Sequence, residues 1–243
     1  QSCDVYFYEL ANRIGVERIA KMASILGLGQ LTGIDLPGEK SGLVPTRSWK
    51  QKTLGKSWQG GETILAGIGQ GFVLSTPLQL AVMTARLATG REIKPHLLRA
   101  LISGEEIRVT DRPLPPKLKI NPQHLEVIKS GMDAAVNTPR GTGWGARISE
   151  KKNSMAGKTG TSQVRRISSY ERETGIIKNE ELPWKDRDHS LFVAFAPVKK
   201  PKLAISVIAE HGGSGSKVAA PVARDILEEA FKRNLLSASS RKN

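Results

Sequence analysis

The sequence predicts an α+β fold, with helices in the first half of the chain and an antiparallel sheet in the last third. Through the first half, apolar residues recur every three or four positions, which is the spacing of amphipathic helices. Two β-rich apolar runs, Leu191–Val198 and Leu203–Glu210, then form a candidate hairpin, and a last amphipathic segment follows them. Strands that follow helices and are covered by a terminal helix are typical of the α+β class.

Two helices are expected within Val5–Gly27, with Gly15 between them. Their apolar stripes consist of Tyr6, Leu10 and Ile14 in the first helix and of Ile19, Met22, Ala23 and Leu26 in the second. The segment Leu28–Arg47 is rich in Gly and Pro, and we therefore expect a loop with short extended pieces there.

A further helix is predicted to begin at Thr76-Pro77 and to end at Gly90. Thr is a favourable N-cap, and Pro suits the first helical position because its missing N–H is not needed there. The apolar face of this helix is formed by Leu80, Met83 and Leu87.

A β-ribbon is predicted over Pro95–Val109, with Leu98, Ala100 and Ile102 alternating and a turn at Gly104-Glu105. The next segment, Asp111–Pro122, contains four prolines and is expected to cross the surface as a linker. Asn121 then caps a helix that carries apolar residues toward Val136.

The last third begins with a candidate strand at Met155–Val164, followed by a charged insertion at Arg165–Asp188. Both strands of the subsequent hairpin are expected to be largely buried, because they are almost continuously apolar. Glycines at 212–215 separate the hairpin from the final helix. The apolar side of that helix is expected to carry Val222, Ile226, Ala230 and Phe231.

The net charge of +14 is the most unusual bulk property of the 243 residues. The Lys and Arg residues are dispersed, and the few aromatic residues are not interleaved with them as stacking platforms for bases. We therefore favour a solvated basic surface, with contact to anionic lipid or cell wall second and nucleic acid third. No stretch reaches the roughly 18 apolar residues of a membrane span.

Metal and disulfide chemistry are not indicated. The single cysteine, Cys3, excludes an internal disulfide, and the four histidines do not show metal-ligand spacing. We expect neither a cofactor nor a metal, and structural roles for the histidines.

The sharpest chemical signal is Lys158-Thr159-Gly160-Thr161, which falls on the candidate strand. Lys158 offers a cation to a carboxylate, and the two threonines offer hydroxyl groups. A glycine at 160 removes a side chain, so that a peptide can lie against the edge of the strand.

A second signal, Ser2-Cys3-Asp4, stands directly before the first helix. Taken alone it is better explained by helix capping, since Ser2 or Asp4 is an ordinary N-cap.

Together the two signals resemble the second and third motifs of the penicillin-binding proteins and serine β-lactamases. Further segments resemble the elongation-type group of class B penicillin-binding proteins and follow that family's order along nearly the whole chain. These segments are Thr32–Glu39, Pro45–Arg47 with Trp49-Lys50, Gly67–Gly71, Thr76–Gln79, Arg187–His189, Ala194–Pro197 and Glu210–Gly213. Asp4 stands where many relatives have Asn.

The resemblance implies the transpeptidase fold, with a five-stranded antiparallel sheet between helices and a helical subdomain. It further implies that Ser2 relays a proton, that Asp4 orients that network, and that Lys158 polarises Ser2 and attracts the substrate's carboxylate. Thr159 and Thr161 would hydrogen-bond this carboxylate, and the Thr161 N–H would form one arm of an oxyanion hole. Gly160 would belong to the same substrate-binding strand.

The family's nucleophile and its activating lysine, Ser-x-x-Lys, are expected upstream of the second motif. Three such pairs occur in the chain, at Ser149, Ser214 and Ser239, and none begins a buried helix as a nucleophile requires. The chain opens on Gln1 and reaches motif residues at once. We therefore expect a truncated piece, inactive alone, in which residues 1–236 are the C-terminal part of a transpeptidase domain and 237–243 are a disordered tail.

By the same resemblance, the function would be peptidoglycan D,D-transpeptidation in cell-wall elongation, with β-lactams acylating the nucleophile. The partners implied are D-Ala-D-Ala stem peptides, a membrane glycosyltransferase and the elongation machinery, and nucleic acid is not among them. An upstream helix would tether the protein to the periplasmic face of the inner membrane. A β-lactamase-like hydrolase, a non-catalytic peptide-binding or partner-binding fragment, and a basic nucleic-acid binder stay open as alternatives.

Overall fold

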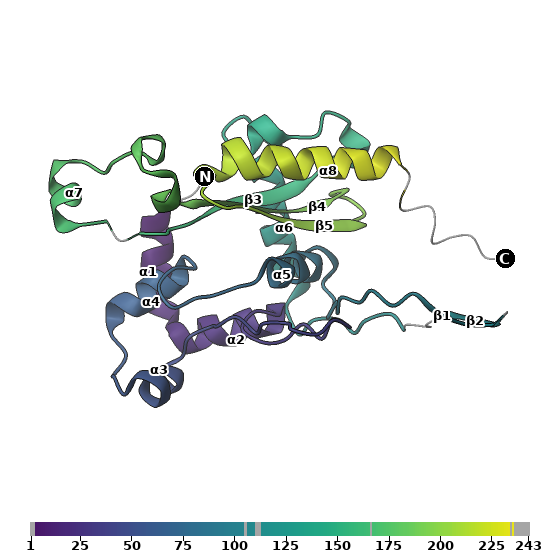
Figure 1. The fold of residues 1–243 in the computed structure, drawn as a ribbon, viewed down its shortest axis with the longest axis horizontal. Helices are drawn as coiled ribbons and strands as arrows, with labels where there is room; N and C mark the ends of the chain where they lie inside the picture. Colours follow the sequence, from purple (N-terminus) through teal and green to yellow (C-terminus); the bar gives the residue numbers. More distant parts are fainter. Residues whose placement is uncertain (1–2, 105, 110–112, 166, 234, 236–243) are drawn as a thin grey trace. The chain divides into compact units, whose positions relative to one another are not determined.

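A computed structural model describes residues 3–104, 106–109, 113–165, 167–233 and 235 of the chain (Figure 1). The chain divides into two compact units, one from Cys3 to Leu125 and one formed mainly by the residues from Glu126 onward. The predicted tail at 237–243 lies outside the described residues. None of the described helices is both long and apolar enough to cross a membrane.

Helices dominate the first unit. They are α1 (Asp4–Ile14), α2 (Val16–Leu26), α3 (Arg47–Leu54), α4 (Gly60–Gly67) and α5 (Pro77–Thr89). Gly15 separates α1 from α2, and Gly27 ends α2 in the left-handed conformation with φ 98°. The two predicted N-terminal helices and the loop that follows them are therefore confirmed. Neither α3 nor α4 was predicted from the sequence.

The face that α1 buries is not the predicted stripe. Tyr6 is 62% exposed and Leu10 is 37% exposed, whereas Ala11 is buried. The reason is a close approach to α4: a Cβ added at Gly67 would lie 2.3 Å from the Cβ of Ala11. Two helix backbones can come this near only where both side chains are small. The face that α1 buries is therefore determined by the small size of Ala11 and not by the hydrophobicity of the predicted stripe.

Helix α5 begins as predicted, with Thr76 as N-cap. The Thr76 hydroxyl accepts from the Gln79 N–H at 3.1 Å, and the Gln79 side chain accepts from the Thr76 N–H at 3.0 Å. Gln79 is fully buried, and its amide group donates to Gln30 O at 2.7 Å and to Ser41 O at 2.8 Å. A buried polar side chain thereby fixes the preceding loop to α5. Of the predicted apolar face, Leu87 is buried and the other two residues are half-buried.

A short antiparallel hairpin follows, formed by β1 (Ala100–Ser103) and β2 (Glu106–Val109), and it confirms the predicted ribbon with a later start. Residue 105 of the predicted turn lies outside the described residues. The side chain of Asn121 accepts from the Gln123 N–H at 2.9 Å and thus caps α6 (Pro122–Asn137), as predicted.

The second unit contains a sheet in the order β3-β4-β5, with both pairs antiparallel. Its strands are β3 (Ala156–Ser162), β4 (His189–Ala196) and β5 (Leu203–Ala209), which confirms the predicted strand and hairpin. The resemblance implied five strands, whereas the described residues supply three to this sheet. Burial also differs between the hairpin strands: β4 is central and largely buried, whereas β5 at the edge is half-buried throughout.

Helix α8 (Ala220–Lys232) lies along the sheet and follows a π-helical turn, Gly215–Ala219 (Figure 1). The prediction of its buried side was wrong for Val222 and Ile226, which are 42% and 49% exposed, whereas Phe231 packs against the core as predicted. The helix packs mainly through alanines and Leu227. The core of this unit consists of Val136, Ala146, Ile148, Met155, Phe192, Ala194, Ala196, Ala219, Ala220, Ala223 and Leu227. Small residues allow α8 to approach the sheet closely, and Leu227 and Phe231 pack against the same core, whereas Val222 and Ile226 stay largely exposed.

One buried ion pair joins α3 to α4 in the first unit. Lys50 is 4% exposed, and its Nζ donates to Glu62 Oε1 at 2.5 Å and to Ser57 O at 2.8 Å. The second carboxylate oxygen of Glu62 accepts from the Gln59 N–H at 2.7 Å. Burial opposes ionisation of Glu62, but the hydrogen bonds from Gln59 and Lys50 outweigh it and lower the pKa of the carboxyl group.

Replacing Lys50 by Met should destabilise the first unit by about 3 kcal/mol, because it leaves the Glu62 carboxylate partly buried without its cation. The matched control is Lys52→Met, an exposed lysine of the same helix, for which we expect a change below about 0.5 kcal/mol. Hydrogen exchange of α3 and α4 peptides in increasing urea measures both. Equal midpoints for the two variants would show that the ion pair does not stabilise this unit.

Candidate active site

The predicted substrate-binding motif lies on β3, as the sequence indicated. Thr159 is paired with Phe192 of β4, and Gly160 is paired with Leu191. Among the described strands, β3 has a neighbour on the β4 side alone. Strand β3 is thus an edge strand of the described sheet, and an extended peptide can add to such an edge as a further strand.

The polar side chains of the motif form a short chain of hydrogen bonds. Lys158 Nζ donates to Thr159 O at 2.8 Å and, more weakly, to Thr159 Oγ1 at 3.4 Å. Thr159 Oγ1 in turn donates to Thr142 Oγ1 at 3.1 Å. Thr142 comes from the turn after α6 and was not identified from the sequence. The local signal for it is a threonine between two glycines, which is too short to be specific without the structure.

Two glycines of β3 are present for different reasons. A Cβ added at Gly157 would lie 2.6 Å from Phe192 Cζ and 2.6 Å from Val193 O, so packing requires glycine there. At Gly160 the added Cβ would meet only Leu191 Cβ, at 3.4 Å, which is an ordinary contact. The fold alone therefore does not account for the glycine in the motif.

The second predicted motif is described only in part. Ser2 lies outside the described residues, and Asp4 is exposed at the first position of α1. The N-cap is Cys3, whose side chain does not make a capping hydrogen bond, so the alternative of Asp4 as N-cap is wrong. Asp4 belongs to the first unit and β3 to the second. Strand β3 thus brings together four of the six predicted residues, from Lys158 to Thr161.

The Ser-x-x-Lys pairs that were set aside occupy irregular positions. Ser149 is exposed before a short 3-10 turn, and Lys152 is paired with Glu150 at 2.6 Å. Ser214 precedes the π-helical turn, where its Oγ lies 3.0 Å from Ser216 Oγ, and Lys217 is exposed. The pair at Ser239 lies outside the described residues.

Two of the four histidines meet at the end of β4. The His211 N–H donates to His189 Nδ1 at 2.9 Å, so this nitrogen of His189 does not carry a proton. His211 Nδ1 lies 2.9 Å from Arg187 O and therefore carries the proton. Among the described residues, no group of three or more His, Cys, Asp or Glu side chains is arranged to hold a metal ion.

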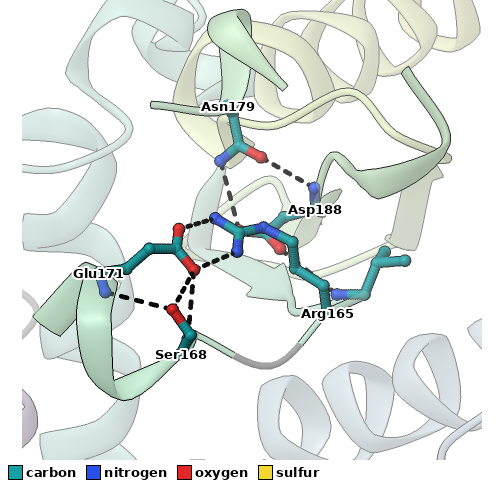
Figure 2. A network of polar contacts seen from close by, with 6 residues as sticks. Arg165, Ser168, Glu171, Asn179 and Asp188 are labelled. Atoms are coloured by element: carbon teal, nitrogen blue, oxygen red, sulfur yellow. Dashed lines mark hydrogen bonds and ion pairs between the residues drawn. The ribbon is translucent and has the colours of Figure 1, made fainter. Parts of the chain in front are cut away.

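The charged insertion between β3 and β4 is folded by a polar network (Figure 2). Arg165 donates from both terminal nitrogens to the two oxygens of Glu171, each at 2.7 Å. Ser168 caps the short helix α7 (Ser169–Thr174) by accepting from the Glu171 N–H at 3.2 Å. At the base, Asp188 accepts from the Val164 N–H and from the Asn179 amide, both at 3.3 Å. The ends of the insertion are thereby tied together beside the motif strand.

The polar network lowers the pKa of Glu171. The hydrogen bonds from Arg165, and after them those from Ser168, lower the pKa of Glu171 from its ordinary 4.5 to about 2. A carboxyl group whose pKa is lower in the folded protein than in the unfolded chain stabilises the folded protein at pH values above its unfolded pKa. That stabilisation is lost as the pH falls from about 4.5 through about 2.

Glu171→Gln should therefore loosen the insertion at pH 6, and the difference from the unsubstituted protein should shrink as the pH falls from about 4.5 toward about 2. Hydrogen exchange of peptides within 167–188, compared between the two proteins at each pH, measures this. Glu150→Gln, at an exposed ion pair with Lys152, serves as control and should leave exchange in the insertion unchanged. A constant difference between the Glu171 variant and the unsubstituted protein at all pH values would refute the assignment.

Comparison with known proteins identifies the family. A family model described as the penicillin binding protein transpeptidase domain matches residues 1–228. Peptidoglycan D,D-transpeptidase MrdA of Salmonella typhimurium is 40% identical over 235 residues, which are 95% of this chain and 37% of that protein.

Solved structures agree with this match. PBP2 in its complex with MreC from Helicobacter pylori superposes with a TM-score of 0.77 at 31% identity, over 94% of this chain and 38% of that one. PBP2 of Pseudomonas aeruginosa in complex with WCK 5153 gives 0.74 at 38% identity, over 94% of this chain and 45% of that one. The chain thus spans less than half the length of these relatives. With a match over nearly all of its residues and this identity to PBP2 proteins, the chain belongs to the penicillin-binding protein transpeptidase family.

Proposed function

We propose that the chain is the C-terminal part, residues 1–236, of a transpeptidase domain that cross-links peptidoglycan stem peptides in cell-wall elongation. In that reaction a serine attacks the D-Ala-D-Ala amide, D-Ala leaves, and an amine of a neighbouring stem resolves the acyl-enzyme. β-Lactams acylate the same serine. The nucleophile and its lysine are assigned to a Ser-x-x-Lys motif that precedes the second motif.

The roles proposed for the motif residues follow their chemistry. Ser2 relays the proton to the leaving amine and Asp4 orients it, while Lys158 polarises Ser2 and attracts the substrate's carboxylate. Thr159 and Thr161 donate hydrogen bonds to that carboxylate, and the Thr161 N–H is one arm of the oxyanion hole. The stem peptide lies along β3, where Gly160 leaves room for it.

One observation favours this proposal over the alternative functions. The motif stands on β3, the edge strand of the described sheet, and Gly160 is a glycine that the packing of the fold does not require. A peptide that approaches the strand backbone provides the missing reason. A nucleic-acid binder would not need an edge strand that carries a lysine and two threonines.

The partners and the location are proposed from the relatives. The H. pylori PBP2 structure is a complex with MreC, and we propose that this protein likewise joins the elongation machinery together with a membrane glycosyltransferase. The proposed site of action is the periplasmic face of the inner membrane. A role in cell shape follows from the proposed function in elongation.

The proposal is tested by intact mass spectrometry after incubation with benzylpenicillin. We expect one drug mass to be added to the full-length protein at a serine outside these 243 residues. This chain alone should stay unmodified. A modified chain would place the nucleophile within it, and peptide mapping would then begin at Ser2, Ser149 and Ser214. A full-length protein that is not modified would refute the enzymatic function and favour a non-catalytic binding role.

Gly160→Ala in the full-length protein should slow acylation by benzylpenicillin roughly tenfold or more, because the added methyl group displaces the ligand from the strand edge. The thermal midpoint should stay unchanged, since the methyl group makes only an ordinary contact within the fold. The matched substitution Gly157→Ala should instead cost about 1–3 kcal/mol of stability by overpacking against Phe192. If Gly160→Ala lowers stability as much as Gly157→Ala does, the glycine is structural and the proposed peptide site loses its support.

A further inference from the structure

Thr142 lies in a turn that connects α6 to a short 3-10 helix at Trp144–Ala146. Its hydroxyl accepts a hydrogen bond from Thr159 Oγ1 at 3.1 Å. Thr159 is the motif residue next to Lys158, so Thr142 is one hydrogen bond away from the proposed carboxylate site. None of the predicted motifs includes it.

The backbone of this turn is fixed against the end of α6. The Gly141 N–H donates to Thr138 O, and the Gly143 N–H donates to Ala135 O, both at 2.8 Å. A Cβ added at Gly141 would lie 2.3 Å from Ala135 O, and one added at Gly143 would lie 3.3 Å from the same atom. Thr142 therefore lies between Gly141 and Gly143, which both contact the end of α6 closely. These two contacts fix the backbone position of Thr142.

Strand β4 supplies a second anchor. Phe192 is 1% exposed, is the strand partner of Thr159, and has its Cε2 atom 3.6 Å from a Cβ added at Gly143. One buried ring thus packs beside the strand that carries Thr159 and beside the turn that carries Thr142. The two hydroxyl groups meet because both backbones are held by the same core residue.

We propose that Thr142 is a positioning residue, whose hydroxyl holds the Thr159 hydroxyl in the orientation that receives the substrate's carboxylate. This inference rests on the proposed function. Thr159 Oγ1 accepts from Lys158 Nζ and donates to Thr142, so its oxygen is held from two sides. When a carboxylate accepts the hydrogen bond of the Thr159 hydroxyl, the Thr142 hydroxyl can rotate and donate to Thr159 Oγ1, because a hydroxyl group both donates and accepts. A site held in this way binds the carboxylate without a prior change of rotamer.

The test uses the full-length protein with Thr142→Val, which keeps the shape but removes the hydroxyl, and Thr142→Ser, which restores it. Thr138→Val is the matched control, since the Thr138 hydroxyl lies at the same turn but donates to Ala134 O at 2.7 Å. The probes are benzylpenicillin and its methyl ester, in which the carboxylate is blocked. Acylation rates over a range of concentrations separate the half-saturating concentration from the limiting rate.

We expect Thr142→Val to raise the half-saturating concentration of benzylpenicillin about fivefold, the loss of one hydrogen bond, with little change in the limiting rate. The methyl ester should not distinguish Thr142→Val from the unsubstituted protein. Thr142→Ser and Thr138→Val should behave as the unsubstituted protein does. In a Thr159→Val background, Thr142→Val should add no further loss, because it acts through Thr159.

Other outcomes overturn the inference. Unchanged kinetics of Thr142→Val with benzylpenicillin would show that Thr142 does not position Thr159. Equal losses with both probes, accompanied by a lower thermal midpoint, would assign Thr142 to the stability of the turn alone. An unsubstituted protein that neither probe acylates would refute the proposed function itself, and the inference with it.

Discussion

The close packing around the central strand β4 is the constraint on which the second unit depends. Ser190 of this strand is fully buried, and its hydroxyl donates to Ser214 O at 3.0 Å and accepts from the Ala219 N–H at 3.1 Å. It thereby satisfies two backbone groups of the π-helical turn inside the core, where an unpaired polar group would be costly. The turn lies so close to the sheet that a Cβ added at Gly215 would be 2.6 Å from Gly160 O and from Leu191 O. Helix α8 then begins in a place fixed by backbone contacts.

The motif strand takes its position from the same packing. Phe192 lies against Gly157 on β3 and reaches toward Gly143 in the turn after α6. Strand β3 is thus located by a large ring on its partner strand, and it is the edge strand of the described sheet. A peptide-binding edge strand needs this rigid support, because a preorganised edge binds without first being ordered.

The elements that the sequence predicted are those whose signals are local. Thr76 and Asn121 cap helices through hydrogen bonds to residues two or three positions away, and Gly15 and Gly27 end helices by themselves. Strands β4 and β5 were recognisable because a buried sheet needs continuous apolar runs. The Lys158–Thr161 segment could be predicted as a substrate-binding motif because four consecutive residues carry its chemistry.

The features that the sequence did not predict depend on distant partners. The buried sides of α1 and α8 are set by close approach through alanines, so Tyr6 of α1 and Val222 and Ile226 of α8 stay exposed. Gln79 is buried because it bonds two carbonyl groups 38 and 49 residues away. The contact of Thr142 with Thr159 likewise joins residues 17 positions apart that are ordinary in their own surroundings. A pattern within a short window does not contain this information.

The glycines of β3 illustrate how structure separates a residue needed for packing from one available for function. Gly157 and Gly160 are three positions apart on the same strand and look equivalent in the sequence. A side chain at Gly157 would overlap with Phe192 and with the Val193 carbonyl group, so packing in the core alone explains this glycine. At Gly160, the fold has room for a methyl group. Glycine weakens a strand, and no contact within the molecule explains why it is present at this position. A glycine that weakens its strand and is not required by its neighbours points to a contact outside the chain. On the edge strand β3, next to Lys158 and Thr159, we propose that this contact is the backbone of a bound peptide.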